Sequence, residues 1–143
     1  MTYSRVRTGV AQYGQVAVAA EVAYASPHRL VQVLMEGALD KVAAAKGQVG
    51  RRDLEGKSRN ISWAVSIIKG LRNALDHEKG GEIAANLDDL YDYLCRRLVQ
   101  ANNANDLSIL EEVSSLLGEV KAGWDAIPPD LHRGATVRQA VAG

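Results

Sequence analysis

The sequence predicts an all-α protein, an antiparallel up-down-up-down four-helix bundle with an N-terminal capping segment. Three observations support this fold class. Four stretches of about 20 residues carry apolar side chains at helical spacing. Short turns that contain helix-capping residues separate these stretches. The chain of 143 residues has no Phe and is dominated by Ala, Val and Leu, which suits helices that pack closely through small side chains.

The first two helices have clear start signals. Ser26 can cap the free backbone N–H groups of the first helix, and Pro27 suits its first helical position. Residues 50–53 are expected to form a short turn. The second helix is expected over 54–78, and the glycine pair at 80–81 is expected to end it, because glycine tolerates the left-handed conformation of a C-cap.

The third helix is expected over 82–102, and the asparagine-rich turn after it offers Asp106 as the N-cap of a fourth helix. Pro128-Pro129 would stop that helix. Because the connections are short, successive helices should be antiparallel neighbours. The predicted organisation is a mobile N-terminal cap segment over 1–25, a four-helix bundle over 26–127 and a flexible tail over 128–143.

Charge and hydropathy exclude several kinds of partner. The 17 basic and 17 acidic residues cancel and form no basic stripe, which argues against nucleic acid or an anionic membrane as a partner. No run approaches the roughly 20 apolar residues that a membrane span needs, so no membrane insertion is expected. The apolar run 16–20 is too short for a secretory signal, so the sequence predicts a cytoplasmic protein.

Catalytic and metal-binding patterns are missing from the sequence. No phosphate-binding loop, dinucleotide fingerprint, nucleophile elbow or Cys-x-x-Cys is present. None of His28, His77 and His132 follows a Glu by three residues, as a di-metal bundle would require, so all three are predicted to be surface histidines. Cys95 is predicted to be a small buried hydrophobe. We therefore expect no enzyme activity, metal or cofactor.

The second helix has two apolar stripes. One contains Ile61 and Ile68 and is the core stripe, whereas Trp63, Ile67 and Ala74 form another that is rotated by roughly 120°. This second stripe either packs against a neighbouring helix or the N-terminal segment, or it forms an exposed groove for a partner helix. Helical periodicity does not separate these alternatives.

The third helix is also broadly apolar. Its expected core line includes Ile83, Leu87 and Leu90, while Tyr91 and Tyr93 lie on opposite margins of that line. A tyrosine at the margin of a core usually keeps its hydroxyl in water. Two on opposite margins equally suit a peptide-binding surface.

The most distinctive motif is GGEIAANLDDLYDYLCRRLVQANNAND, which begins at Gly80 and ends at Asp106. It is similar to the Gly-Gly-Glu-Ile-Ala, Leu-Tyr-x-Tyr, Arg-Leu and Ala-Asn…Asn-Asp elements of FliS-type flagellar export chaperones. Ala25-Ser26-Pro27 resembles the start of that family's first helix, and LMEGA at 34–38 resembles its Leu-Tyr-Asp-Gly-Ala element. The resemblance extends over about residues 11–124, with departures at Tyr24, Met35 and Glu36.

This resemblance implies an antiparallel bundle that binds the disordered C-terminal segment of flagellin, prevents its polymerisation in the cytoplasm and helps to deliver it to the type III export gate. The guest becomes partly helical as it wraps the bundle. Export-gate and other flagellar proteins are candidate further partners. The N-terminal segment, with Tyr13 and Val16, would cover part of the groove and move aside.

The guest is expected in a groove that involves the second and third helices. The candidate residues are Trp63, Ile67 and Ala74 on the second helix and Ile83, Asn86, Leu87, Leu90, Tyr91 and Tyr93 on the third. Asn86 is expected to hydrogen-bond the guest backbone. The competing hypothesis is a structural bundle that buries its second stripes against an identical chain. The chaperone itself is expected to be a monomer or a weak dimer.

Overall fold

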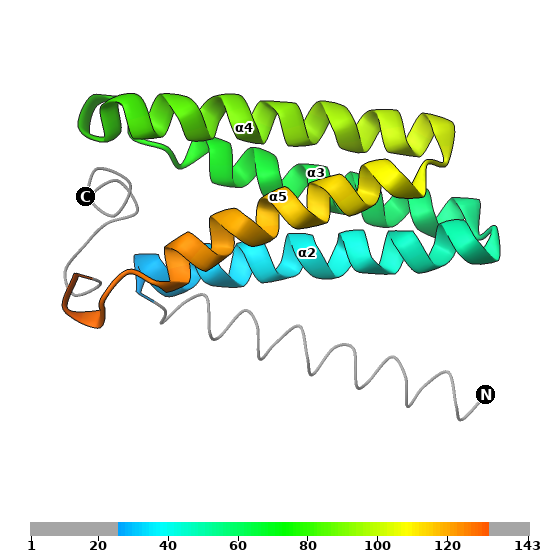
Figure 1. The fold of residues 1–143 in the computed structure, drawn as a ribbon, viewed down its shortest axis with the longest axis horizontal. Coiled ribbons are helices and arrows are strands. Elements are labelled where there is room, and N and C mark those ends of the chain that lie inside the picture. The colour runs from blue at the N-terminus through cyan, green and yellow to red at the C-terminus, as the bar shows by residue number, and fades with distance from the viewer. Residues whose placement is uncertain (1–25, 132–143) are drawn as a thin grey trace.

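A computed structural model describes residues 26–131, which form four α-helices and one short 3-10 helix (Figure 1). The elements are α2 (Pro27–Arg51), α3 (Leu54–Asn73), α4 (His77–Ala104), α5 (Leu107–Asp125) and η1 (Pro129–Leu131). The proposed N-terminal cap, with Tyr13 and Val16, and most of the C-terminal tail lie outside the described residues.

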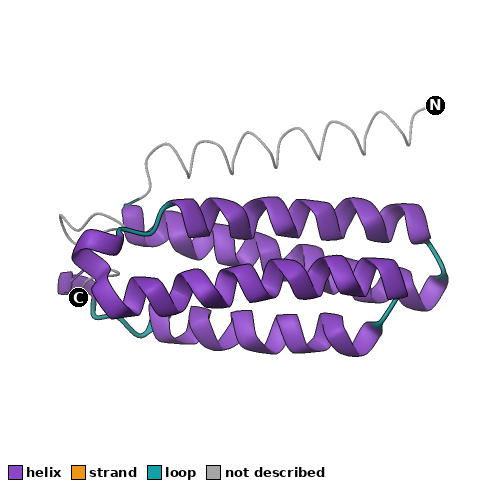
Figure 2. Cartoon of the chain, turned by 90° about the horizontal axis from the view of Figure 1, so that it is seen from above, coloured by secondary structure: helices purple, strands orange, loops and turns teal. Residues whose placement is uncertain are grey.

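The four helices form an antiparallel up-down-up-down bundle (Figures 1 and 2). Each helix packs against the next one along the chain, and α5 returns to pack against α2. The order around the bundle is therefore α2, α3, α4, α5, which confirms the predicted fold class. As a consequence, the α2–α3 and α4–α5 contacts lie on opposite sides of the molecule.

Helix capping accounts for the boundaries at both ends of the bundle. The Ser26 side chain accepts a hydrogen bond from the Arg29 backbone N–H at 3.1 Å, and Asp106 accepts one from the Ser108 N–H at 2.9 Å. Both predicted N-caps are confirmed. Arg52 and Asn105, in left-handed conformations with φ of 60° and 52°, end α2 and α4.

The expected end of the second helix is wrong. Helix α3 stops at Asn73, and Asp76 starts the next helix by accepting hydrogen bonds from the backbone N–H groups of Glu78 and Lys79. The left-handed glycine is Gly81, with φ of 51°, but it interrupts α4 after its first turn instead of capping α3. A carboxylate cap ahead of the glycine pair therefore decides where the chain turns.

The core is a single apolar cluster along the bundle axis. Its buried residues come from all four helices: Val31, Met35, Ala38, Val42, Ala45, Ile61, Ala64, Ile68, Leu71, Ala84, Tyr91, Leu94, Cys95, Leu98, Ala101, Ile109, Leu110, Val113, Leu117 and Trp124. On α4 the core line is rotated from the predicted one. Ile83 is 51% exposed, whereas the neighbouring Ala84 is fully buried. The prediction of Ile83 as a core residue is wrong, because α4 turns its Tyr91 and Cys95 side inward.

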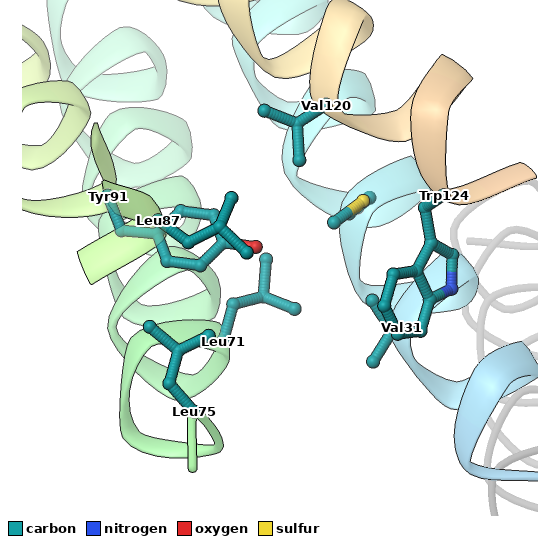
Figure 3. A pocket seen from close by; sticks show the side chains of 8 residues that line it. Val31, Leu71, Leu75, Leu87, Tyr91, Val120 and Trp124 are labelled. Carbon is teal, nitrogen blue, oxygen red and sulfur yellow. The ribbon is translucent and has the colours of Figure 1, made fainter. Parts of the chain in front are cut away.

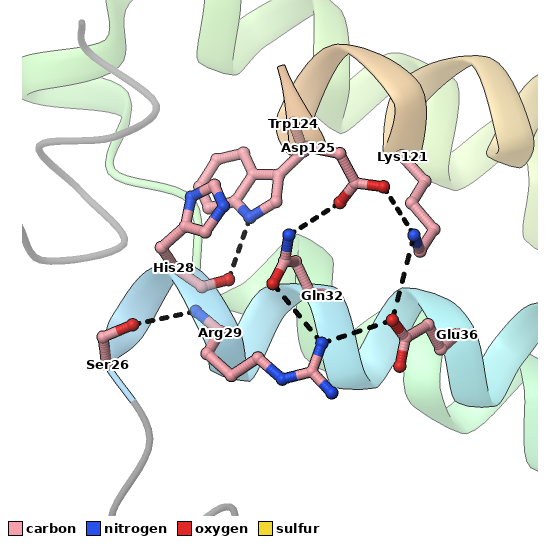
Figure 4. A network of polar contacts seen from close by, with 8 residues as sticks. All are labelled: Ser26, His28, Arg29, Gln32, Glu36, Lys121, Trp124 and Asp125. Atoms are coloured by element: carbon pink, nitrogen blue, oxygen red, sulfur yellow. Dashed lines mark hydrogen bonds and ion pairs between the residues drawn. The ribbon is translucent and has the colours of Figure 1, made fainter. Parts of the chain in front are cut away.

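His28 is not the surface histidine that the sequence suggested. Its side chain is 3% exposed, and its ring stacks on Trp124 with the ring centroids 4.9 Å apart and the planes 9° from parallel. The Trp124 indole N–H donates to the His28 carbonyl oxygen at 2.9 Å (Figure 4). Position in the first turn of a helix does not predict exposure here, because the end of α5 covers that turn.

A polar chain beside this stack joins α2 to α5 (Figure 4). The Gln32 side-chain amide donates to Asp125 at 2.8 Å, and Lys121 donates to the same carboxylate at 2.6 Å. Lys121 also lies 3.8 Å from Glu36, which accepts from Arg29 at 3.3 Å. We call this end of the bundle the Trp124 end. Its contacts fix the start of α2 against the end of α5.

The opposite end is held by a buried lysine. Lys57, in the first turn of α3, is 3% exposed, and its ammonium donates to the Asn102 carbonyl oxygen at 2.9 Å and to the Asn105 side-chain oxygen. Ser58 donates to the Asn102 side chain at 3.0 Å. A cation at the C-terminus of α4 also interacts favourably with the helix dipole. This contact ties the start of α3 to the end of α4.

A Tyr–Glu–Arg group connects α4 to α5. The Tyr93 hydroxyl donates to Glu112 at 2.9 Å, and the Arg97 guanidinium donates to the other oxygen of the same carboxylate at 2.7 Å. These bonds, that from Arg97 first, hold the pKa of Glu112 below its ordinary value. The hydroxyl end of Tyr93 is thereby held against α5.

The buried position of Lys57 yields a stability prediction. Lys57→Met should lower the free energy of unfolding by about 1–3 kcal/mol, because Asn102 and Asn105 lose a charged donor. Thermal unfolding followed by circular dichroism should show this as a melting temperature lower by roughly 3–10 °C. Lys69→Met, at an exposed position on the same helix, is the control and should change little. Equal melting temperatures for both variants would contradict the role of Lys57.

The lowered pKa of Glu112 yields a pH prediction. A carboxyl whose pKa is lower in the folded protein stabilises the fold above its unfolded pKa of about 4.3, and this contribution is lost as the pH falls through the folded value. Glu112→Gln should therefore reduce stability at neutral pH, and this cost should be smaller near pH 3. Thermal unfolding at the two pH values measures the difference. The exposed neighbour Glu111 provides the control, and a Glu111→Gln variant with the same pH profile would exclude this explanation.

Candidate functional site

The candidate residues on α3 lie beside α2. Trp63 is 53% exposed, and the Lys41 ammonium of α2 lies 3.9 Å from its ring centroid. Ile67 is half-buried, and its Cδ1 lies 3.5 Å from the place that a Cβ on Gly37 of α2 would occupy. Ala74, the C-cap of α3, is exposed on the same side. We call these five residues the α2/α3 surface.

Most candidate residues on α4 lie on the side toward α5. Tyr93 marks this side through its hydrogen bond to Glu112. Ile83, Asn86 and Leu90 share the same side at helical spacing. Ile83 is 51% exposed, Asn86 is exposed, and Leu90 is half-buried. We call Ile83, Asn86, Leu90 and Tyr93 the α4/α5 surface. It combines apolar side chains with an amide and a hydroxyl.

Two candidates on α4 lie deeper. Tyr91 is 3% exposed, and its hydroxyl points into a small cavity inside the bundle (Figure 3). Burial raises the pKa of Tyr91 to about 12, so its hydroxyl keeps its proton at physiological pH. Leu87 is half-buried and lines the same cavity. Tyr91 is thus an interior residue in this structure, and Tyr93 is the tyrosine at the surface.

The structure does not bring the candidates from the two helices together. The α2/α3 surface and the α4/α5 surface lie on opposite sides of the bundle, because α3 presents its second stripe to α2 while α4 presents its own to α5. The sequence interpretation expected a groove that involves the second and third helices, with candidate residues on both. Hydrophobic periodicity shows which faces of each helix are apolar, but it does not give the rotation of the two helices relative to each other.

A groove between α3 and α4 exists, but different residues line it. They are Val65, Lys69, Asp92, Cys95, Arg96 and Val99, around a volume of about 320 Å³. Val99 is 51% exposed, and Arg96 pairs with Asp92 at 3.0 Å. Burial raises the pKa of the Cys95 thiol, which suits the predicted small buried hydrophobe. Sequence reasoning missed this groove because Val65 has the spacing of a core residue.

The described part of the chain holds neither a metal-binding cluster nor a helix that could span a membrane. Within residues 26–131, no three His, Cys, Asp or Glu side chains are grouped so that they could hold a metal ion. No helix in the same range is long and apolar enough to cross a membrane. The candidate site comprises the two surfaces, the groove between α3 and α4, and the cavity.

Comparison with known proteins identifies the family. Residues 9–131 match the family described as flagellar protein FliS. The chain is 54% identical to flagellar secretion chaperone FliSB of Pseudomonas aeruginosa over 81% of this chain and 92% of that protein. It is 44% identical to flagellar secretion chaperone FliS of Salmonella typhimurium over 85% and 91%, and 34% identical to FliS of Bacillus subtilis over 70% and 74%. The chain therefore belongs to the FliS family, whose members are flagellar secretion chaperones and not enzymes.

Proposed function

We propose that this FliS-family protein acts in the cytoplasm as the export chaperone of flagellin. It binds the disordered C-terminal segment of flagellin, prevents premature polymerisation and aids delivery to the flagellar type III export apparatus. Family membership supports the general role in flagellar secretion. The cytoplasm is the compartment in which an export chaperone meets its guest before secretion.

The observation that carries this proposal is the pair of exposed apolar side chains on opposite sides of the bundle. Trp63 is 53% exposed on one side and Ile83 is 51% exposed on the other. Trp63 is accompanied on its side by Ile67 and Ala74, and Ile83 by Leu90. Contiguous exposed apolar surface of this kind marks sites of interaction with a partner. One straight guest helix contacts only one side, whereas a segment that is disordered when free can wrap around the bundle and contact both.

The dimensions of the bundle set a minimum length for the guest. Neighbouring helix axes are about 8–10 Å apart, so a path from one surface to the other around a helix pair covers roughly 20 Å. An extended chain spans about 3.3 Å per residue, so at least about six guest residues must lie between the two docked parts. The ordering of this segment costs entropy, which wide apolar contact must offset.

Each surface has its own role in the proposal. On the α2/α3 surface, Trp63, Ile67 and Ala74 provide apolar contact for a guest helix. On the other side, Ile83 and Leu90 provide apolar contact. Asn86 and Tyr93 flank that contact, and we propose that the Asn86 amide hydrogen-bonds the guest backbone.

Titration calorimetry with a synthetic C-terminal flagellin peptide tests the proposal directly. We expect a complex of one peptide per chain, with a negative heat-capacity change from apolar burial. Trp63 fluorescence should shift to shorter wavelength as the peptide covers the ring. Light scattering on the free protein tests the alternative of a structural homo-oligomer. A tight dimer that buries Trp63 and binds no peptide would replace the chaperone proposal.

A matched set of variants tests where the guest binds. Ile83→Asp and Trp63→Asp should each weaken peptide binding by roughly tenfold or more, because a charge replaces an exposed apolar contact. Val99→Asp is the control, since Val99 has the same exposed fraction as Ile83 but lies in the groove between α3 and α4. Circular dichroism should show unchanged helical content for all three. If only Val99→Asp weakens binding, the guest occupies that groove instead.

A further inference from the structure

A small apolar cavity lies at the Trp124 end of the bundle (Figure 3). All four helices and the turn after α3 contribute to its lining, which consists of Val31, Met35, Leu71, Leu75, Leu87, Tyr91, Val120 and Trp124. Its volume is about 30 Å³. The indole N–H of Trp124 is engaged by the His28 carbonyl oxygen, so the polar group that faces the cavity is the Tyr91 hydroxyl.

The chemistry of the lining limits what the cavity can hold. A buried water needs about 10–15 Å³ and two to four polar partners. The cavity has the room but offers one hydroxyl, so ordered water is poorly held there. A ring is too large, and a charged group would lack a partner. The branched end of an aliphatic side chain fits both the size and the apolar walls.

Part of the cavity lining is half-buried, and several of its residues lie on α4 and α5. Leu75, Leu87 and Val120 are half-buried and form its rim, whereas Val31 and Tyr91 are buried and form its floor. Ile83, which is 51% exposed, precedes Leu87 by one helical turn on α4. An apolar surface therefore continues from the exposed side of α4 into the interior of the bundle.

We infer that this cavity is an anchor site that receives one Leu, Ile or Val side chain of the guest bound on the α4/α5 surface. The inference rests on the proposed function and adds a specific position to it. Residues that dominate binding usually fill a desolvated pocket, and their neighbours only exclude water from it. Ile83 and Leu90 would support the guest backbone, and the anchor would enter between Leu87 and Val120.

Variants that fill the cavity distinguish an anchor site from a simple packing defect. Val120→Leu adds one methylene group from the α5 side of the rim, and Val31→Leu adds one from the α2 side of the floor. Both variants should melt at or above the temperature of the wild type, because an internal void is filled. Both should bind the flagellin peptide roughly 10- to 100-fold more weakly, since the anchor side chain is excluded.

An alanine scan of the peptide identifies the partner of the cavity. With the wild-type protein, changing one aliphatic residue of the peptide to Ala should weaken binding roughly tenfold or more. With the Val120→Leu variant, the same change in the peptide should weaken binding less than about twofold. Val99→Leu, which makes the same change in the groove between α3 and α4, is the control. It should leave both the melting temperature and the affinity unchanged.

The outcomes distinguish this inference from the proposed function. If the wild type does not bind the peptide, the proposed function fails and the anchor site fails with it. If the wild type binds but both cavity variants bind equally well, only the anchor site is wrong. If both variants melt at a markedly lower temperature, the space has no room for a further side chain, which also overturns the anchor site.

Discussion

The close approach of the helices depends on alanines in the core. Ala38, Ala45, Ala64, Ala84 and Ala101 have no exposed surface, and they come from α2, α3 and α4. A methyl group at these positions lets neighbouring backbones pack closely, and the chain has no Phe to hold them apart. Larger side chains such as Tyr91 and Trp124 fill other parts of the same core. Trp63 and Ile83 lie outside it and remain on the surface.

The two ends of the bundle are stabilised by different chemistry, and this bears on where a guest can enter. At one end Lys57 bonds the last turn of α4, and the helices are joined through polar contacts to backbone and side-chain oxygens. At the other end the His28–Trp124 stack and the Gln32–Asp125 bond join α2 to α5, and Arg72 pairs with Asp88 and Asp92 to join α3 to α4. The α4 side of that end has an interrupted helix at Gly81 and the cavity described above.

Much of the fold was predictable from local signals. The Ser26 and Asp106 caps follow from side-chain chemistry near the helix ends, the four helices from apolar periodicity, and their antiparallel order from the short connections. The errors have two causes. Asp76 capped a helical turn before the glycine pair, and this local signal competed with the one that the glycines provide. His28 was covered by a distant part of the chain and Ile83 turned outward, and these two outcomes depend on tertiary packing.

For the candidate site, the sequence by itself determined which helices have apolar residues beyond the core line, and the GGEIAANLDDLYDYL motif determined the family. Only the tertiary structure decided that Tyr91 is interior while Tyr93 bonds Glu112 at the surface. It also decided that the second stripes of α3 and α4 lie on opposite sides. The reason is physical, because periodicity specifies the angle between side chains on one helix, whereas the rotation of each helix in the bundle is settled by packing against all its neighbours.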